Sequence, residues 1–223
     1  GLFTGARIDE LAQLRLKDVR TEGEYTVLEI SHTDETSTKN VASERTTPLH
    51  RDVLALGFLE YVADVKKVAG AKARLFPYLL ETVHGFADVP SEAFARHLKA
   101  VGVKDGRKVF HSFRSTLNNE LTKAGVPEQA RNELLGHAHD STNVVHYAGR
   151  LKPERLYSET LAKVGFDSII KPLIKSRYTS GRFVAVLRKE IQRRKAQQEN
   201  KAARLARGLP PLRSNKSKRQ ADL

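Results

Sequence analysis

The chain has 223 residues, of which 39% are hydrophobic and 29% charged, the composition of a globular protein large enough to bury a core. Cysteine is absent, which excludes disulfides, thiolate zinc sites and a cysteine nucleophile. No apolar run approaches the roughly eighteen residues of a membrane span, and no secretory signal is visible at the start. Because the chain opens at Gly1 without an initiator methionine, we expect a fragment whose natural N-terminal part is missing.

The formal net charge of +13 comes from the last quarter of the chain. Residues 171–223 hold 16 Lys and Arg against 3 Asp and Glu, whereas residues 1–170 hold 23 of each sign. A basic excess favours nucleic acid as a partner, but here the argument applies to the C-terminal part alone. We therefore expect a neutral body, residues 1–170, followed by a basic extension, residues 171–223, that is partly helical and then disordered.

The spacing of apolar residues predicts the elements in chain order. The first half of the body should contain a helix at 4–18 capped by Thr4, a strand at 25–31, a polar loop at 32–44, a short strand at 45–50 and a helix at 51–69. The second half should contain helices at 90–101, 110–124, 127–135 and 153–164, with a short capped segment at 140–147. In the extension we expect a basic helix at 182–206 and disorder over 208–223. The predicted fold class is mainly α with a small antiparallel β-sheet (α+β).

Two patterns of charged residues near the start are candidates for a site. In the segment TGARIDEL, Arg7 and Glu10 lie three positions apart at a helix start and can form an ion pair. Taken alone, such a pair is more often a solvated salt bridge. Lys39 lies in the polar loop, with Arg45 a few residues downstream. A lysine in a loop is usually just solvated, so neither pattern identifies a function by itself.

Two further patterns contain histidine. The segment HSFR places His111 and Arg114 side by side on one helix face. The segment LLGH ends a helix at Gly136 and leaves His137 just past it, ten residues before Tyr147. A capping histidine and a half-buried tyrosine are the structural interpretations of the same residues.

Taken together, these side chains favour an anion over a metal ion. The set contains no pair of carboxylates, and two histidines among guanidinium groups make a poor zinc site. Two guanidinium forks fit the non-bridging oxygens of a phosphodiester, and a tyrosine oxygen can attack its phosphorus. A histidine can assist removal of the tyrosine proton, and a lysine can protonate the leaving alkoxide. The residues thus predict metal-free phosphoryl transfer from DNA to tyrosine.

The order and spacing of these motifs resemble the catalytic domain of the tyrosine recombinases, the phage integrase family. The segment TGARIDELAQLRLKDV resembles the family segment around its first arginine, HSFR its His-x-x-Arg box, and LLGHAHDSTNVVHY its Leu-Gly-His box and following tyrosine. Lys39, with Arg45 and Pro48-Leu49 downstream, resembles the hairpin that carries the family lysine. The resemblance covers roughly residues 1–165. It implies the integrase catalytic-domain fold, without the separate N-terminal DNA-binding domain that the family usually has.

The resemblance also implies a role for each motif residue. Six residues would form the catalytic set: Arg7 and Arg114 holding the scissile phosphate, His111 and His137 hydrogen-bonding it and assisting proton transfer, Lys39 as general acid to the 5′ oxygen, and Tyr147 as the nucleophile that forms a 3′-phosphotyrosine. Glu10 would orient Arg7. Tyr157 and Tyr178 are rival tyrosines, but neither keeps the short link to the Leu-Gly-His box.

Partners follow from the same resemblance. The substrate would be double-stranded DNA, exchanged site-specifically without metal, ATP or another cofactor, by a homo-tetramer with accessory DNA-bending proteins and no membrane. The protein would act in the cytoplasm, prokaryotic or phage-encoded, on a chromosome that receives a mobile genetic element. We assign further DNA contacts to five arginines: Arg45, Arg182, Arg188, Arg193 and Arg194. Two other functions stay open, a type IB-like DNA topoisomerase and a catalytically inactive DNA-binding regulator.

Overall fold

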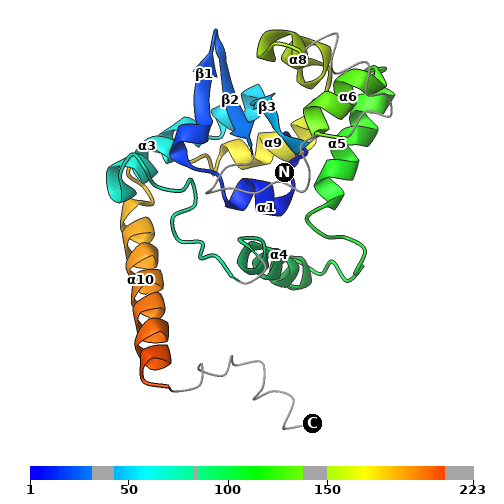
Figure 1. Cartoon of the computed structure of the whole chain (residues 1–223). Helices are drawn as coiled ribbons and strands as arrows, with labels where there is room; N and C mark the ends of the chain where they lie inside the picture. Colours follow the sequence, from blue (N-terminus) through cyan, green and yellow to red (C-terminus); the bar gives the residue numbers. More distant parts are fainter. Residues whose placement is uncertain (32–42, 83–84, 138–149, 209–223) are drawn as a thin grey trace.

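The computed structural model describes residues 1–31, 43–82, 85–137 and 150–208. Most of the expected polar loop, the capped segment at 140–147 and all but the first residue of the expected disordered end lie outside these ranges, as do Lys39 and Tyr147. The described part is mostly helical around one three-stranded antiparallel sheet (Figure 1). The predicted fold class is therefore confirmed.

The sheet is built from β1 (Val19–Glu22), β2 (Tyr25–Ile30) and β3 (Arg45–Pro48), in that order. The central strand pairs Leu28 with Val19 on one side and with Thr47 on the other. Strands β2 and β3 confirm the two strands expected from the sequence. Strand β1 was not expected, because its sequence VRTE is polar and half-exposed at the sheet edge and carries no apolar alternation.

The first helix is much shorter than predicted. Helix α1 covers only Ile8–Ala12, followed by a 3₁₀ turn (Leu16–Asp18) that leads into β1. The chain leaves the helix because residues 14 and 16 form backbone hydrogen bonds with residues 73 and 75: Leu75 N–H donates to the Leu14 carbonyl at 2.7 Å, and Leu16 N–H to the Ala73 carbonyl at 3.0 Å. The expectation of helix over 13–18, and of Thr4 as its cap, was wrong; the residue at the N-cap is Arg7.

The helix predicted at 51–69 is broken in two. Helix α2 covers Arg51–Ala55 and α3 covers Phe58–Ala69. Gly57 between them has φ +89°, and a Cβ on it would lie 2.1 Å from the backbone oxygen of Tyr178. The break therefore needs glycine for two reasons, the left-handed backbone and the close approach of a distant segment.

The remaining helices match their predicted positions within about two residues at most ends, as helix boundaries generally do. They are α4 (Asp88–Ala100), α5 (Ser112–Lys123), α6 (Glu128–Leu135), α8 (Pro153–Glu159) with a 3₁₀ turn (Leu161–Lys163), and α10 (Val184–Ala206). Helix α9 (Asp167–Ile174) was not expected. Ile170 is its one buried residue, and its apolar residues Ile169, Leu173 and Ile174 are each 40–48% exposed.

Two hydrophobic cores flank the sheet. One joins α5, α6 and α8 through fully buried leucines such as Leu117, Leu134 and Leu156. The other joins the sheet, α3 and the segment 73–76 around Val65 and Leu75. Leu187 of α10 belongs to this second core, so the basic extension begins by packing on the body.

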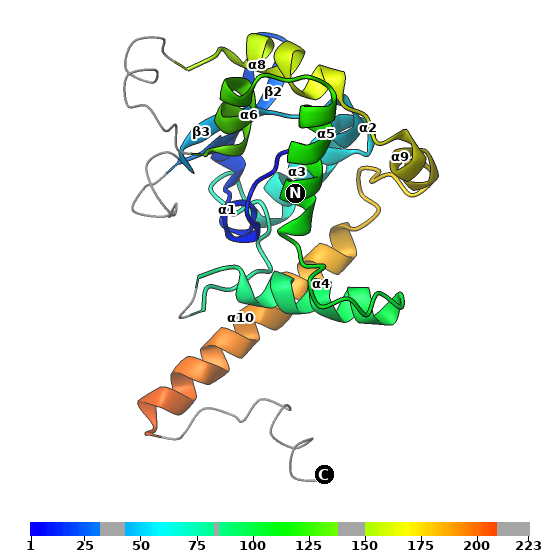
Figure 2. The ribbon, with the colours of Figure 1, turned by 90° about the vertical axis from the view of Figure 1, so that its right-hand side faces the viewer.

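Hydrogen bonds reinforce this attachment of the extension. The carboxylate of Asp64 on α3 accepts from the Tyr178 hydroxyl at 2.8 Å, the Gly181 N–H at 2.7 Å and the Ser180 hydroxyl at 3.3 Å. Burial raises the pKa of Asp64, but these hydrogen bonds outweigh it and hold the pKa below its ordinary value. From Lys195 onward nearly every residue of α10 is exposed, and the helix extends away from the body (Figures 1 and 2).

Residues of helices α4 and α10 help to line a groove of about 950 Å³. Aromatic and aliphatic side chains such as Phe76, Phe94 and Phe183 form its lining, and none of the predicted catalytic residues is among them. None of the described helices combines the length and the apolar character that crossing a bilayer requires.

Candidate active site

Arg7 and Glu10 form the ion pair that their spacing predicts. Arg7 occupies the N-cap of α1, and its Nη1 donates to Glu10 Oε1 at 2.5 Å. The other carboxylate oxygen, Oε2, accepts from the Arg7 backbone N–H at 2.9 Å and so caps the helix. Arg7 Nη1 also donates to the hydroxyl of Ser43 at 3.0 Å, just before β3. Glu10 is only 3% exposed, whereas Arg7 is 27% exposed, so the carboxylate of this pair is buried and the guanidinium partly reaches the surface.

Arg45 on β3 is buried beneath the same carboxylate. Its Nη2 donates to Glu10 Oε2 at 2.9 Å, its Nη1 to the Ser43 carbonyl at 2.7 Å, and its Nε to the Leu134 carbonyl at 3.1 Å. A side chain that is 3% exposed and donates to three protein oxygens is largely enclosed by protein. In the free chain Arg45 thus offers little surface for the DNA contact assigned to it, and that contact stays a prediction.

Strand alternation is the signal that places Arg45 inside. Positions 45, 47 and 49 share one face of β3 and its continuation, and Arg45, Thr47 and Leu49 are all buried. Reading Arg45 in register with Leu49 would have predicted an inward guanidinium. Ser43 was missed as well, and a serine next to a polar loop carries no signal of its own.

Arg114 reaches the cluster from α5. It is 4% exposed, and its Nη1 donates to the Gly5 carbonyl at 2.7 Å. Its Nη2 is buried and has no hydrogen-bond partner among the described residues. Burial, with further lowering by the charges of Arg45 and Arg7, brings the pKa of Arg114 to about 10, so it is a full cation at neutral pH. An unpartnered buried donor on a cation is a ready position for an anion.

The two predicted histidines adjoin these arginines. His111 precedes α5 and is exposed, whereas His137 is half-buried just after Gly136, which ends α6 with φ +71°. Nδ1 of His137 lies 3.3 Å from Oδ1 of Asn132. Burial lowers the pKa of His137, and the positive charges of the three arginines and His111 lower it further. His137 is thus neutral at neutral pH in the free protein.

The two rival tyrosines, Tyr157 and Tyr178, both interact with side chains elsewhere in the body. The Tyr178 hydroxyl donates to Asp64, and burial together with that carboxylate raises the pKa of Tyr178 to about 12. The ring of Tyr157 packs between Tyr25 and His50, at centroid distances of 5.1 and 6.4 Å. Tyr147 itself lies outside the described residues, but the chain that follows it is held near α6, since Leu151 N–H donates to the carboxylate of Glu133.

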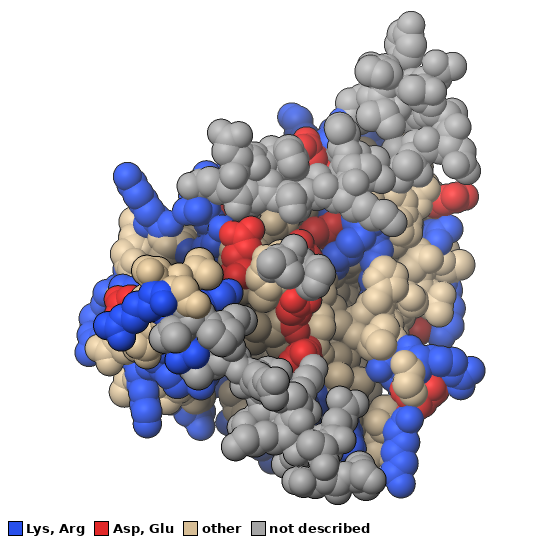
Figure 3. Space-filling view, turned by 60° about the horizontal axis from the view of Figure 1, so that its bottom comes forward, with Lys and Arg blue, Asp and Glu red and all other residues tan. Residues whose placement is uncertain are grey.

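The arginines assigned to DNA in the extension lie in different surroundings. Arg193 and Arg194 both bind the carboxylate of Glu190, at 2.6 and 3.0 Å, whereas Arg182 lies over the ring of Phe183 at 5.2 Å. Arg188 is exposed. Seen from below, Lys and Arg crowd the left side of the molecule, and a column of Asp and Glu separates them from a second basic area (Figure 3).

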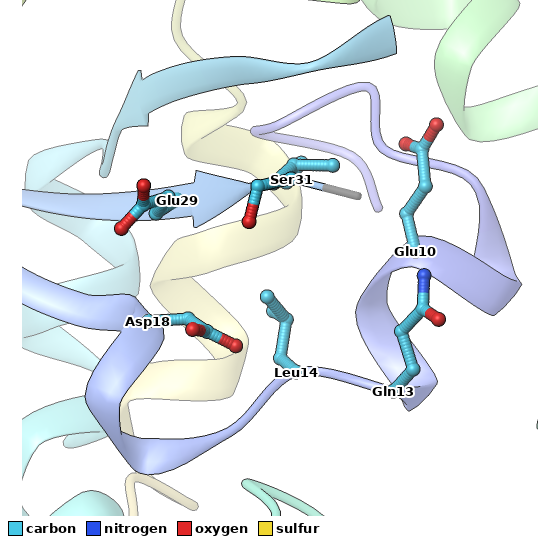
Figure 4. A pocket seen from close by; sticks show the side chains of 7 residues that line it. Glu10, Gln13, Leu14, Asp18, Glu29 and Ser31 are labelled. Atoms are coloured by element: carbon cyan, nitrogen blue, oxygen red, sulfur yellow. The ribbon is translucent and has the colours of Figure 1, made fainter. Parts of the chain in front are cut away.

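Carboxylates near the cluster do not form a metal centre. Glu10, Asp18 and Glu29 line a small cavity of about 10 Å³ beneath the sheet. The carboxylate of Glu10 points away from those of Asp18 and Glu29, so the three acids do not converge (Figure 4). In the part of the chain that the structure describes, no three His, Asp or Glu side chains are grouped to hold a metal ion.

Comparison with protein families decides the relationship. The model of the phage integrase family matches residues 2–153, which is more than half of the chain and contains every predicted catalytic position. The chain belongs to the phage integrase family. Members of this family are generally tyrosine recombinases that act on DNA, so membership supports DNA as the partner. Comparisons with curated proteins and with solved structures gave no match.

Proposed function

We propose that the chain is the catalytic part of a site-specific recombinase that cleaves and rejoins DNA through a 3′-phosphotyrosine at Tyr147. The observation that carries the proposal is the charge ratio of the buried cluster. Among the described residues, Arg7 and Arg45 share the carboxylate of Glu10, and Arg114 lies within reach of its charge but keeps an unpartnered donor. A phosphodiester supplies the missing negative charge and two non-bridging oxygens for the guanidinium forks.

Each cleavage step balances as an exchange of two phosphate esters. The Tyr147 oxygen loses its proton and forms a bond to phosphorus, while the bond from phosphorus to the 5′ oxygen breaks. Lys39 supplies the proton that the departing 5′ oxygen takes up. Arg7 and Arg114 stabilise the charge on the phosphate oxygens, where fixed cations in a dry site act most strongly. The ester keeps the bond energy, so the reverse reaction reseals a strand without ATP.

His137 is suited to remove the tyrosine proton. A neutral imidazole whose Nδ1–H donates to Asn132 Oδ1 leaves the lone pair of Nε2 free to accept a proton. Its lowered pKa keeps that form populated at neutral pH. In this proposal the exposed His111 hydrogen-bonds the phosphate, and Glu10 holds Arg7 in place.

The two parts of the chain divide the work in this proposal. The body, residues 1–170, holds the catalytic set, and the extension, residues 171–223, adds phosphate contacts through α10. Exposed Arg188 fits that role best of the four arginines assigned there, because Arg193 and Arg194 already share Glu190. Oligomers of four chains on DNA and accessory bending proteins complete the proposed assembly.

Covalent trapping tests the proposal even though the target sequence is unknown. The chain is mixed with a pool of random duplexes that carry a nick just downstream of the candidate cleavage site, so that the leaving fragment diffuses away. Adducts that survive denaturation are isolated, their DNA sequenced and their peptide mapped. We expect adducts at Tyr147 that still form in EDTA and are absent from Tyr147→Phe. Mapping to Tyr157 or Tyr178, or a need for added magnesium, would reject the assignment.

Exchange between duplexes separates recombination from relaxation. With two labelled copies of the trapped sequence, a recombinase joins a strand of one duplex to the other. A relaxing topoisomerase removes supercoils from a plasmid and exchanges nothing. Products of mixed label support the proposal, and relaxation alone would replace it.

A further inference from the structure

Arg45 lies at the centre of a closed ring of hydrogen bonds. Arg7 donates to Glu10, Glu10 accepts from Arg45, Arg45 donates to the carbonyl of Ser43, and the Ser43 hydroxyl accepts from Arg7. The ring ties the start of α1 to the start of β3. Every atom of it except part of Arg7 is buried, so water does not compete for the bonds.

The third bond of Arg45 leaves the ring and reaches the end of α6. Its Nε donates to the carbonyl of Leu134 at 3.1 Å, one of the last carbonyls of the helix, which have no partner within the helix itself. The guanidinium also packs under Gly136, where a Cβ would lie 2.7 Å from Arg45 Nη1. His137 follows directly on this turn, so Arg45 supports the backbone that presents it.

We propose that Arg45 is a positioning residue that holds Arg7 and His137 in register with each other. It acts on Arg7 through Glu10 and on His137 through the Leu134–Gly136 turn, and it touches neither DNA nor the reacting atoms. The inference rests on the proposed function for its effect on cleavage, but its geometric part concerns the free chain alone.

Only a guanidinium can make these three bonds at once. Its planar fork donates in three directions, whereas the ammonium group of lysine offers a point charge at the end of a flexible stem. Arg45→Lys therefore keeps a cation for Glu10 while giving up the simultaneous bonds to Leu134 and Ser43. Arg45→Met removes the charge as well, and leaves Glu10 with Arg7 alone. The lysine variant is the decisive one, because it keeps the buried carboxylate paired.

Arg131 provides a matched control. It too donates to a backbone carbonyl, that of Val126, and to side chains of α5, namely Asn118 and Thr122. It joins α5 to α6 without a contact to Glu10 or to the turn after Leu134. Arg131→Met thus shows how far NMR signals and the cleavage rate change when a supporting arginine outside the ring is lost.

The first measurement needs no DNA. In NMR spectra of the isotope-labelled free chain, we expect Arg45→Lys to shift the Gly136 amide and the His137 ring signals, and Arg131→Met to leave both where they are. Unchanged Gly136 and His137 signals in Arg45→Lys would overturn the inference. This result stands whether or not the wild-type chain forms a covalent adduct, so a failure of the proposed function is recognised separately.

The second measurement uses the duplex recovered by trapping, well below the melting temperature of each variant. We expect Arg45→Lys to slow adduct formation at saturating protein on the order of 100-fold, the cost of a misplacement near 1 Å, while its dissociation constant for the duplex stays close to wild type. Arg131→Met should keep the wild-type rate. Equal losses of rate in Arg45→Lys and Arg131→Met, or a loss of affinity that accounts for the whole effect, would overturn the inference.

Discussion

Arginine serves two opposite purposes in the two ends of this molecule. Around Glu10, the guanidinium groups of Arg45 and Arg114 are almost fully buried, and hydrogen bonds fix them to named oxygens. Along α10, arginines and lysines are mostly exposed, and where they pair they do so with a neighbour on their own helix, as Arg193 does with Glu190. The residue type is the same, but the surroundings decide what it can do.

Burial determines how each set would meet a phosphate. A cation in a dry site is little screened by salt and holds one position, so it can favour one geometry of the phosphate. Cations on an exposed helix are screened and mobile, and their attraction depends on the number of ions that they displace from DNA. The buried set is therefore suited to chemistry and the exposed set to attraction.

Removing a buried arginine should have the largest effect. Arg114→Met takes away the unpartnered Nη2, and we expect adduct formation at saturating DNA to fall about 10²–10³-fold, as for the loss of one fixed donor to a transition state. The same change at exposed Arg188 should leave that rate unaltered. The rates of adduct formation of the two variants are compared on the trapped duplex. A similar fall for both would show that buried and exposed arginines do not differ in their effect on chemistry.

Neutralising the exposed set should change affinity and its dependence on salt. Replacing Arg188, Lys189 and Lys195 with glutamine removes three cations from α10. The slope of log affinity against log salt should become shallower by roughly 0.9 for each phosphate that the variant no longer neutralises. The slope is obtained by measuring the affinity of each variant for a non-specific duplex at several salt concentrations. An unaltered slope would mean that these side chains do not touch DNA.

Loosening the anchor of α10 should have a moderate effect on stability. Asp64→Ala leaves the Tyr178 hydroxyl and the Gly181 N–H without their buried acceptor, a cost of about 1–3 kcal/mol in the free energy of unfolding. Because the pKa of Asp64 is lowered in the folded chain, its contribution is complete above about pH 4 and is lost as the pH falls through the folded pKa. Denaturant melts at pH 7 and at low pH should show the gap between variant and wild type closing in acid.

Asp105, whose side chain is 34% exposed, is the control for this anchor. Among the described residues its carboxylate pairs with Arg107 in its own loop, so Asp105→Ala should melt like wild type. A gap between Asp64→Ala and wild type that persists in acid would show that the carboxylate charge is not what holds α10.

The smallest effect is a change in the shape of a pH profile. Since burial and the neighbouring positive charges hold the pKa of His137 below its usual value of about 6.5, the neutral base is the predominant form at pH 7, and the cleavage rate should fall as the pH drops below that usual value. His137→Gln should lower the rate and flatten this acid limb. An acid limb that survives the substitution would assign it to another group, with His111 the next to test.

Where a few neighbouring residues decide a structure, the sequence is sufficient. Helices α5 and α6 follow from apolar spacing and from Gly136 at the end, and the Arg7–Glu10 pair follows from two residues three apart. Where contacts with a distant segment determine the local structure, the local sequence is not sufficient to predict it. The backbone bonds of Leu14 and Leu16 to residues 73–75 shorten the first helix, and the approach of Tyr178 to Gly57 breaks the predicted helix at 51–69.

Arg45 shows the same limit within the site. It was assigned to DNA, and although strand alternation places it on the same face as Leu49, its bond to the Leu134 carbonyl depends on the packing of β3 against the distant helix α6. Likewise, the run of positive charge predicted a basic extension distinct from the body, but it gave no sign that Leu187 and the bonds to Asp64 fasten the beginning of that extension to the body. The number of charged residues in a segment does not indicate which of its cations pair with the same carboxylate.

The shared carboxylate also sets a thermodynamic linkage. With Glu10 divided between Arg7 and Arg45, the folded chain confines more positive than negative charge. Burial lowers the pKa values of Arg45 and Arg114 most, and the charges of neighbouring arginines lower them further. An anion that binds only the folded form returns free energy as RT ln(1 + [L]/Kd), about 2.7 kcal/mol at a hundredfold excess over Kd. The free protein is thus at its least stable without an anion, and a bound phosphodiester would contribute to folding as well as to catalysis.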